Sequence, residues 1–189
     1  FLMLTEAVYL ATDGKVDFLK LEGASLPGEF GARFEILNGR YPAFADCSPD
    51  PRPSANYMFY VNRRLGLGLE NWEESRLAPN PGVFYEAMLF AFPNSATRTL
   101  PAQPRTDTPG IRTYFDHVGI LITRPGANGP ANFAAALKGG SNGEVHNHND
   151  VGTFMVVSER SAPLTDPGSE VYTRRTFSAQ RYESNVINS

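Results

Sequence analysis

Apolar residues near the start of the chain recur at the spacing of helices. A stripe with a period near 3.6 residues runs through residues 1–11 and predicts a packed helix. Phe30, Phe34 and Leu37 lie at positions i, i+4 and i+7. They therefore predict one face of a short helix that Asn38-Gly39 ends.

Two further helices are expected before residue 100. Ser54 is a candidate N-cap for a helix that Gly66 closes, and residues 83–92 predict the last helix. Between the helices, proline-rich segments such as residues 46–54 cannot be regular. Short helices joined by loops rich in proline and glycine are more typical of a helical toroid or array than of a simple bundle.

The pattern changes to that of strands after a polar linker at residues 93–110, which holds four prolines. The strand-like segments are residues 110–125 (two strands with a kink at Asp116-His117), 132–140, 152–159, 162–168 and 183–189. The two patterns together predict an α+β chain. Residues 1–104 form a helical domain, and residues 105–189 form an antiparallel sheet or sandwich.

The composition is that of a folded globular protein, with 41% hydrophobic and 12% aromatic residues. A net charge of −3 argues against a general nucleic-acid binder, although a local arginine cluster can still bind an acidic ligand. No segment approaches the roughly 20 apolar residues of a membrane span, so we expect no membrane insertion. The single cysteine, Cys47, fits a reducing compartment and equally a large bacterial periplasmic or secreted enzyme.

His146 and His148 are two of only three histidines in the chain, and they stand one residue apart. In an extended segment, residues i and i+2 face the same side about 6.5–7 Å apart, so both imidazoles can enter one cavity. Asp166 follows on what should be the neighbouring antiparallel strand, and a hairpin can bring its carboxylate beside them. Two imidazoles and a carboxylate are a possible ligand set for zinc.

Plainer interpretations stay open. An H-x-H pair is common in proteins that bind no metal, and Asp166-Pro167-Gly168 is also an ordinary turn sequence. Gly140, followed after five residues by H-x-H, copies the opening of a cupin metal motif. A cupin also needs a glutamate where this chain has Gly152 or Thr153, and a third histidine downstream, and the sequence has neither.

Three segments, KGGSNGEVHNHNDVGTFMVV, PLTDPGSEVYT and TFSAQRYESNVINS, combine a glycine-rich lead-in, H-x-H-x-D-x-G-x-F, an Asp-x-Gly and an Arg-Tyr pair. This pattern resembles that of the heparinase II/III-like polysaccharide lyases. The upstream segment GRYPAFADCSPD is similar to the part of that family that joins a helical toroid to a β-domain. The resemblance implies the C-terminal part of an (α/α) toroid followed by an antiparallel β-sandwich, both incomplete.

The resemblance also implies roles for individual residues. His148 and Asp166 would hold zinc together with a histidine beyond residue 189, and His146 would be an active-site histidine. Tyr182 would be a second catalytic or substrate-contacting tyrosine. The family's main catalytic tyrosine and a further histidine would lie upstream of Phe1, so we expect this chain alone to be an inactive piece of a longer lyase.

Lyases of this family cleave a uronic-acid polymer by β-elimination. The C5 proton becomes acidic when hydrogen bonds from Asn, His or Arg neutralise the adjacent carboxylate. A Tyr or His then removes that proton, and a Tyr or His protonates the leaving glycosidic oxygen. The expected contacts with the acidic polysaccharide are Asn142, Tyr172, Arg174, Arg175 and Arg181.

The arginines among these residues have two interpretations. They can form a positive wall, since guanidinium pairs bidentately with carboxylate or sulfate, or they are solvated charges at a strand edge. Two functions compete with the lyase hypothesis: a non-catalytic carbohydrate-binding or scaffold module with a structural metal, and a cupin-like metal-dependent oxygenase.

Overall fold

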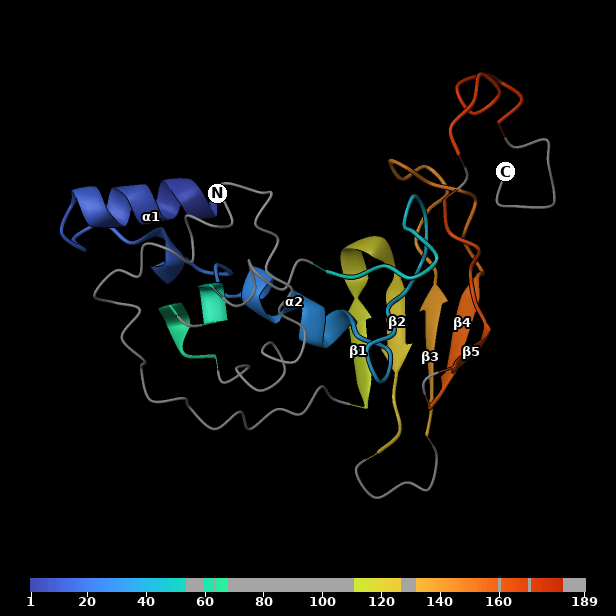
Figure 1. The fold of residues 1–189 in the computed structure, drawn as a ribbon, viewed down its shortest axis with the longest axis horizontal. Coiled ribbons are helices and arrows are strands. Elements are labelled where there is room, and N and C mark those ends of the chain that lie inside the picture. Colours follow the sequence, from blue (N-terminus) through green and yellow to red (C-terminus); the bar gives the residue numbers. More distant parts are fainter. Residues whose placement is uncertain are drawn as a thin grey trace. The chain divides into compact units, whose positions relative to one another are not determined.

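The computed structural model describes residues 1–53, 60–62, 64–67, 111–126, 132–159, 161–169 and 171–181. Within these ranges the protein is α+β, with helices near the N-terminus and a five-stranded antiparallel sheet (Figure 1). The chain forms two compact units, Phe1–Arg33 with Pro53–Thr108 and Phe34–Arg52 with Pro109–Ser189. The division into two domains near residue 105 stays a prediction.

The first unit begins with the expected helix, α1 (Leu2–Ala11), followed by the short 3-10 helix η1 (Phe18–Lys20). The Asp17 side chain caps η1 by accepting the backbone N–H of Leu19 at 3.1 Å. Residues 60–62 and 64–65 are also helical, and Gly66 closes this helix at φ +64°, as predicted. The apolar core of the unit is made by Leu2, Leu19, Ala24, Tyr60 and Val61.

A buried ionic network connects α1, η1 and the helix that ends before Gly66. The Arg64 guanidinium donates to Glu6 at 2.6 Å and lies 3.1 Å from the Asp17 carboxylate. The Tyr60 hydroxyl donates to the same Glu6 carboxylate, and the guanidinium stacks 4.1 Å from the centre of the Tyr9 ring. With its side chain only 2% exposed, Arg64 is a cation that depends on these partners.

Helix α2 (Leu26–Phe34) ends three residues before Leu37, so the prediction that Leu37 belongs to this helix is wrong. Asn38 and Gly39 instead form a tight turn, with φ values of 50° and 82°, that pairs Leu37 with Arg40. The N–H of Ile36 donates to the Arg40 carbonyl at 2.7 Å. Asn-Gly favours such a turn because both of its residues tolerate positive φ.

The sheet is a meander in which each strand pairs with the next along the chain. Its strands are β1 (Arg112–Phe115), β2 (Ile120–Thr123), β3 (Phe133–Lys138), β4 (Phe154–Ser158) and β5 (Ser161–Leu164). The predicted kink between the first two strands is a 3-10 turn, η3 (Asp116–Val118). All five strands fall within segments predicted as strands, apart from the first residue of β5. The predicted strand at residues 183–189 lies outside the described residues.

One face of the sheet forms the core of the second unit. Ile122, Ala136 and Val157 are fully buried there, and the segment Phe34–Arg52 contributes Ile36 and Phe44 to the same cluster. Figure 1 shows this segment in blue to cyan beside the sheet.

Polar contacts attach the segment Phe34–Arg52 to the sheet. The Arg124 guanidinium donates to the Glu35 carbonyl, at 2.8 Å from Nε, and to Thr113 Oγ1 at 2.8 Å. The N–H of Ala43 lies 3.2 Å from the Met155 sulfur. The first two contacts attach Glu35 to the edge of the sheet at β1 and β2, and the third attaches Ala43 to β4.

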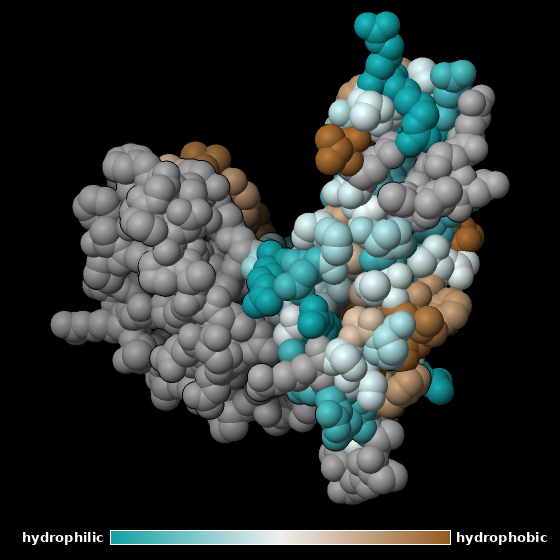
Figure 2. Space-filling view, turned by 45° about the vertical axis from the view of Figure 1, so that its right-hand side comes forward, coloured by the Kyte–Doolittle hydropathy of each residue, from teal (hydrophilic) through white to brown (hydrophobic). Residues whose placement is uncertain are grey.

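The opposite face of the sheet carries an exposed apolar row. The register places Tyr114 opposite Leu121, Leu121 opposite Leu137, and Leu137 opposite Phe154. Tyr114, Leu137 and Phe154 are 43–60% exposed. Figure 2 shows hydrophobic atoms, in brown, gathered over part of the surface of this unit.

No helix among the described residues is long and apolar enough to cross a membrane.

Candidate functional site

The segment that carries both histidines is a series of turns between β3 and β4. His146 and Asn149 have φ values of 61° and 60°, in the left-handed region. The Asn147 side chain stabilises the second of these turns by accepting the N–H of Asn149 at 2.5 Å. The prediction of an extended segment is therefore wrong, because left-handed residues interrupt it.

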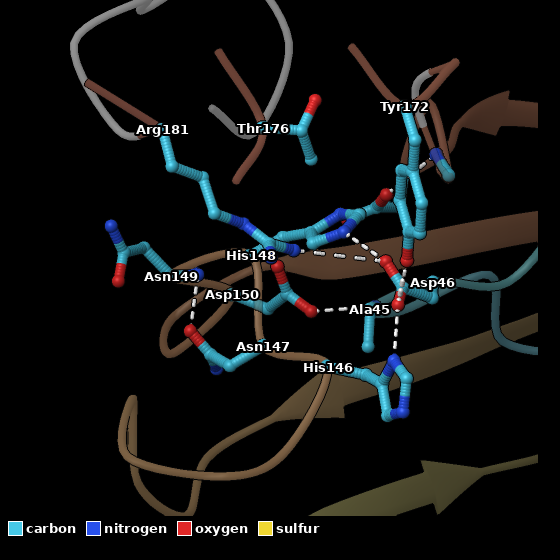
Figure 3. A network of polar contacts seen from close by, with 12 residues as sticks. Ala45, Asp46, His146, Asn147, His148, Asn149, Asp150, Tyr172, Thr176 and Arg181 are labelled. Carbon is cyan, nitrogen blue, oxygen red and sulfur yellow. Dashed lines mark hydrogen bonds and ion pairs between the residues drawn. The ribbon is translucent and has the colours of Figure 1, made fainter. Parts of the chain in front are cut away.

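Both imidazoles nevertheless reach one carboxylate, that of Asp46. His146 Nδ1 lies 2.5 Å from Oδ2, and His148 Nε2 lies 2.5 Å from Oδ1 (Figure 3). The Tyr172 hydroxyl donates to Oδ2, and Arg181 Nη2 lies 3.8 Å from Oδ1. Segments that lie about a hundred residues apart in sequence thus meet at a single side chain.

The backbone conformation of Ala45 sets the direction in which the Asp46 side chain points. Ala45 has a φ of 57°, and its N–H donates to Asp150 Oδ2 at 2.6 Å. Asp150 is 1% exposed and lies only two residues after His148. The histidine loop therefore holds the backbone from which Asp46 projects, and Asp46 in turn holds both histidines.

The hydrogen bonds at Asp46 set the charge of the site. Burial alone would raise the pKa of the Asp46 carboxyl, but the bonds from Tyr172, His146 and His148 together hold it below its ordinary value. The bond to Asp46 raises the pKa of the Tyr172 hydroxyl. The site therefore pairs an ionised carboxylate with a phenol that keeps its proton.

The loop after β5 packs against the residues that follow Asp46. The N–H of Ser169 donates to the Cys47 carbonyl at 2.7 Å, and Asp166 Oδ1 accepts the N–H of Gly168 at 2.8 Å. Burial raises the pKa of the Cys47 thiol, and the charges of Asp46, Asp166 and Asp150 raise it further. Three carboxylates therefore lie around this segment, and Asp166 and Asp150 are each only 1% exposed.

Two buried polar atoms of the histidine loop lack a hydrogen-bond partner in the part of the chain that the structure describes. His148 Nδ1 is buried and has no hydrogen-bond partner among the described residues, and the same is true of Asp150 Oδ1. A histidine that binds metal through one ring nitrogen typically donates its other N–H to a carboxylate, and His148 Nε2 already faces Asp46. The described ranges contain no group of three or more His, Cys, Asp or Glu side chains that could hold one metal ion.

An ion pair between the buried Lys138 and the partly exposed Glu144 supports the loop that leads to the histidines. Lys138 Nζ donates to the Val118 carbonyl and to Glu144 Oε2, each at 2.7 Å. The hydrogen bond from Lys138 lowers the pKa of the Glu144 carboxyl. Gly140 lies between them at φ +81°, and a Cβ there would come 2.5 Å from the Glu144 carboxylate. The ion pair therefore leaves no room for a side chain at position 140, so this residue must be glycine.

The structure brings together only some of the residues predicted for substrate contact. Tyr172 and Arg181 lie at Asp46, and Arg175 donates to the Arg181 carbonyl at 3.3 Å. Asn142 accepts the N–H of Val151 at 3.3 Å, which places it in the histidine loop, and Arg174 is exposed. Tyr182, predicted as catalytic, lies outside the described residues.

Asp46, the residue on which the site converges, was not among the predicted site residues. The only sequence signal for it was that GRYPAFADCSPD is similar to a domain-joining segment of the lyases. No protein-family model matches the chain, and a search of curated proteins finds no relative.

Proposed function

We propose that this chain is part of a polysaccharide lyase that cleaves a uronic-acid-containing polymer by β-elimination. The observation that supports this function most directly is that His146 and Tyr172 bond to the same oxygen of Asp46. The His146 side chain is 68% exposed, and so can meet a substrate. An imidazole that can accept a proton then lies beside a phenol that can donate one, which is the pair of groups that elimination needs.

In the proposed reaction, His146 removes the C5 proton of a uronic-acid residue. The electrons of the broken C–H bond form the C4–C5 double bond, and the C4–O bond breaks. A hydroxyl such as that of Tyr172 protonates the departing glycosidic oxygen, and its raised pKa keeps that proton in place beforehand. Tyr182 stays a candidate for the same step, or for substrate contact.

Arginine provides the positive charge that an acidic polysaccharide requires. Arg181 lies 3.8 Å from the Asp46 carboxylate and is partly exposed, so it is close to the group that would take the proton. A guanidinium there can bind the substrate carboxylate and make the C5 proton more acidic. We assign Asn142, Arg174 and Arg175 to outer parts of the same binding surface.

Zinc is the cofactor that we propose, with His148 and Asp166 among its ligands and a third ligand from another part of the protein. When bound, zinc would supply a cross-link between the histidine loop and the loop after β5 without contacting the substrate. His148 supports this role through its buried Nδ1, a ligand atom that no described residue satisfies.

We further propose that the sheet is one layer of a β-sandwich and that the helices belong to a toroid. The row from Tyr114 to Phe154 supports the sandwich, since a continuous exposed apolar row on a sheet face is normally covered by another layer. A periplasmic or secreted location agrees with a polymeric substrate, which is met outside the cytoplasm.

The test is an assay of the longer protein that contains this chain, with several uronic-acid polymers as substrates. A lyase releases unsaturated uronide products, which absorb in the ultraviolet. We expect His146→Ala to abolish this absorbance and His117→Ala, a change at a 98% exposed side chain, to leave it unchanged. Full activity in His146→Ala would contradict the role of that residue.

Metal analysis separates the lyase from the other candidate functions. We expect bound zinc that is lost in His148→Ala and in Asp166→Ala but kept in His117→Ala. Bound iron or manganese without zinc would instead favour the cupin-like oxygenase. Bound zinc without any release of uronide would favour a carbohydrate-binding or scaffold module with a structural metal.

A further inference from the structure

His146 and His148 present different ring nitrogens to one acceptor. Asp46 Oδ2 faces Nδ1 of His146, and Asp46 Oδ1 faces Nε2 of His148, each at 2.5 Å. In Figure 3 the two rings approach the carboxylate from different sides. The two histidines of one motif therefore contact the same side chain through different ring nitrogens.

The chemistry of a carboxylate then determines where each ring carries its hydrogen. An aspartate is ionised at neutral pH, and an ionised carboxylate can only accept hydrogen bonds. The nitrogen that faces Asp46 must therefore be an N–H in both rings. In the neutral imidazoles, His146 then carries its proton on Nδ1 and His148 on Nε2.

The remaining nitrogens differ in their surroundings. His146 Nε2 belongs to a side chain that is 68% exposed, so its lone pair is accessible to a ligand in solution. His148 Nδ1 is buried without a hydrogen-bond partner among the described residues. Its lone pair can be satisfied by a cation or a donor that reaches the interior, but not by bulk solvent.

We propose that Asp46 is the positioning residue of this site and that it fixes the two histidines in opposite tautomers. His146 is held with Nε2 exposed as a proton acceptor, and His148 is held with Nδ1 directed to the buried side as a ligand atom. The Tyr172 hydroxyl shares Oδ2 with His146, so the same carboxylate also sets the position of the phenol. The identification of Nε2 as the base and of Nδ1 as a ligand atom rests on the proposed function, whereas the two tautomers do not.

The position of Asp46 is itself restricted, as this role requires. The bond from the Ala45 N–H to Asp150, at 2.6 Å, fixes the backbone directly before it. Both of its oxygens are occupied, Oδ2 by His146 and Tyr172 and Oδ1 by His148. A carboxylate held from both sides is able to select tautomers, whereas a mobile one would let each ring exchange between the two forms.

Nuclear magnetic resonance can test the tautomers without any substrate. In the chain labelled with ¹⁵N-histidine and titrated to neutral imidazoles, long-range ¹H–¹⁵N correlations distinguish Nδ1–H from Nε2–H rings. We expect Nδ1–H for His146, Nε2–H for His148 and an averaged mixture for the exposed His117. If His146 and His148 showed the same tautomer, or both averaged as His117 does, the proposal would be overturned.

A substitution at Asp46 tests the cause. In Asp46→Asn the side chain offers one oxygen and one NH₂ group, so only one ring can keep its N–H toward residue 46. We expect one of the two histidines to switch tautomer, while Asp50→Asn, a change at an exposed carboxylate, leaves both rings unchanged. Two unchanged rings in folded Asp46→Asn would contradict the proposal. If that variant does not fold, the wild-type spectrum alone decides.

Activity provides an independent readout. In the lyase assay, we expect Asp46→Asn to lower kcat by roughly 10²–10⁴-fold with a smaller change in KM, as for other carboxylates that orient a catalytic histidine. A wild-type kcat in this variant would overturn the catalytic part of the role. Opposite tautomers in a protein that releases no uronide would support the positioning role and count against the proposed function alone.

Discussion

The Asp150 carboxylate accepts the backbone N–H of Ala45 at 2.6 Å within the second unit. This bond joins the histidine loop to the segment that carries Asp46, and Ala45 takes a left-handed conformation to make it. A left-handed alanine is costly, so the bond must offset that cost in the folded protein. The geometry of the site therefore depends on a residue that contacts neither imidazole.

We expect Asp150→Ala to destabilise the protein by about 1–3 kcal/mol, because the half-buried N–H of Ala45 would lose its acceptor. Urea denaturation followed by circular dichroism measures this change. Asp116→Ala, at an exposed carboxylate, serves as the control and should stay within about 0.5 kcal/mol of the wild type. Equal urea midpoints for Asp150→Ala and the control would show that the bond contributes nothing.

A second prediction concerns pH and the pair of Lys138 and Glu144. The hydrogen bond from Lys138 lowers the pKa of Glu144 in the folded state, so the unfolded chain binds a proton there more readily. The stabilisation is thus fully present above the ordinary glutamate pKa of 4.5 and is lost as the pH falls through the lower folded value.

The measurement compares the wild type with Glu144→Gln by urea denaturation at a series of pH values. We expect the variant to be less stable at pH 7 and the difference to shrink steadily below pH 4.5. Glu22→Gln, at an exposed glutamate, should show no such trend. A difference that grew on acidification would have the wrong sign and would exclude this role for the pair.

The strands were predictable because their cause is local. β3 was predicted as a run of apolar residues that ends at Gly139-Gly140. Which residues it buries was not predictable in this way, because Ala134 and Ala136 are buried while the larger Phe133 and Leu137 are exposed. The helix predicted through Leu37 failed because spacing alone cannot distinguish a helix from a turn. Asn38-Gly39 is a strong turn signal as well as a helix end.

The site was predictable only in part, because its centre is not local. His146 and His148 could be identified as a pair, since they are neighbours in the sequence. Asp46 lies about a hundred residues earlier, and its direction comes from the bond between Ala45 and Asp150. A single sequence gives no signal for such a long-range contact. The two histidines could therefore be predicted as site residues, but the carboxylate that binds them could not.

A third prediction concerns the buried ionic network of the first unit. We expect Arg64→Met to destabilise the protein by about 3–5 kcal/mol, because Glu6 and Asp17 would lose the cation that compensates their charge. Adding Glu6→Gln to this variant should recover part of the loss. Arg52→Met, which removes an exposed ion pair with Asp50, should cost at most about 1 kcal/mol.

Thermal and urea denaturation measure the stability that each of these variants loses. If Arg64→Met lost no more stability than Arg52→Met, the buried network would be dispensable. If the double variant were no better than Arg64→Met alone, uncompensated charge would not explain the loss, and the packing of Arg64 against the Tyr9 ring would be the better cause.

The fourth prediction compares two glycines with similar backbone conformations. Gly168 has a φ of 76°, and a Cβ there would lie 2.6 Å from the Cys47 carbonyl oxygen. Gly39 has a φ of 82°, and a Cβ there would meet no atom within 4 Å. Alanine at either position bears the left-handed penalty of about 1–2 kcal/mol, but only at position 168 does it also push two chain segments apart.

We therefore expect Gly168→Ala to be clearly less stable than Gly39→Ala in urea denaturation, with the difference due to the contact at Cys47. The displaced loop also carries Asp166, so Gly168→Ala should bind zinc more weakly while Gly39→Ala binds it like the wild type. Because the two variants share the backbone strain, equal stability would show that the loop after β5 does not need its close approach to residues 47–49.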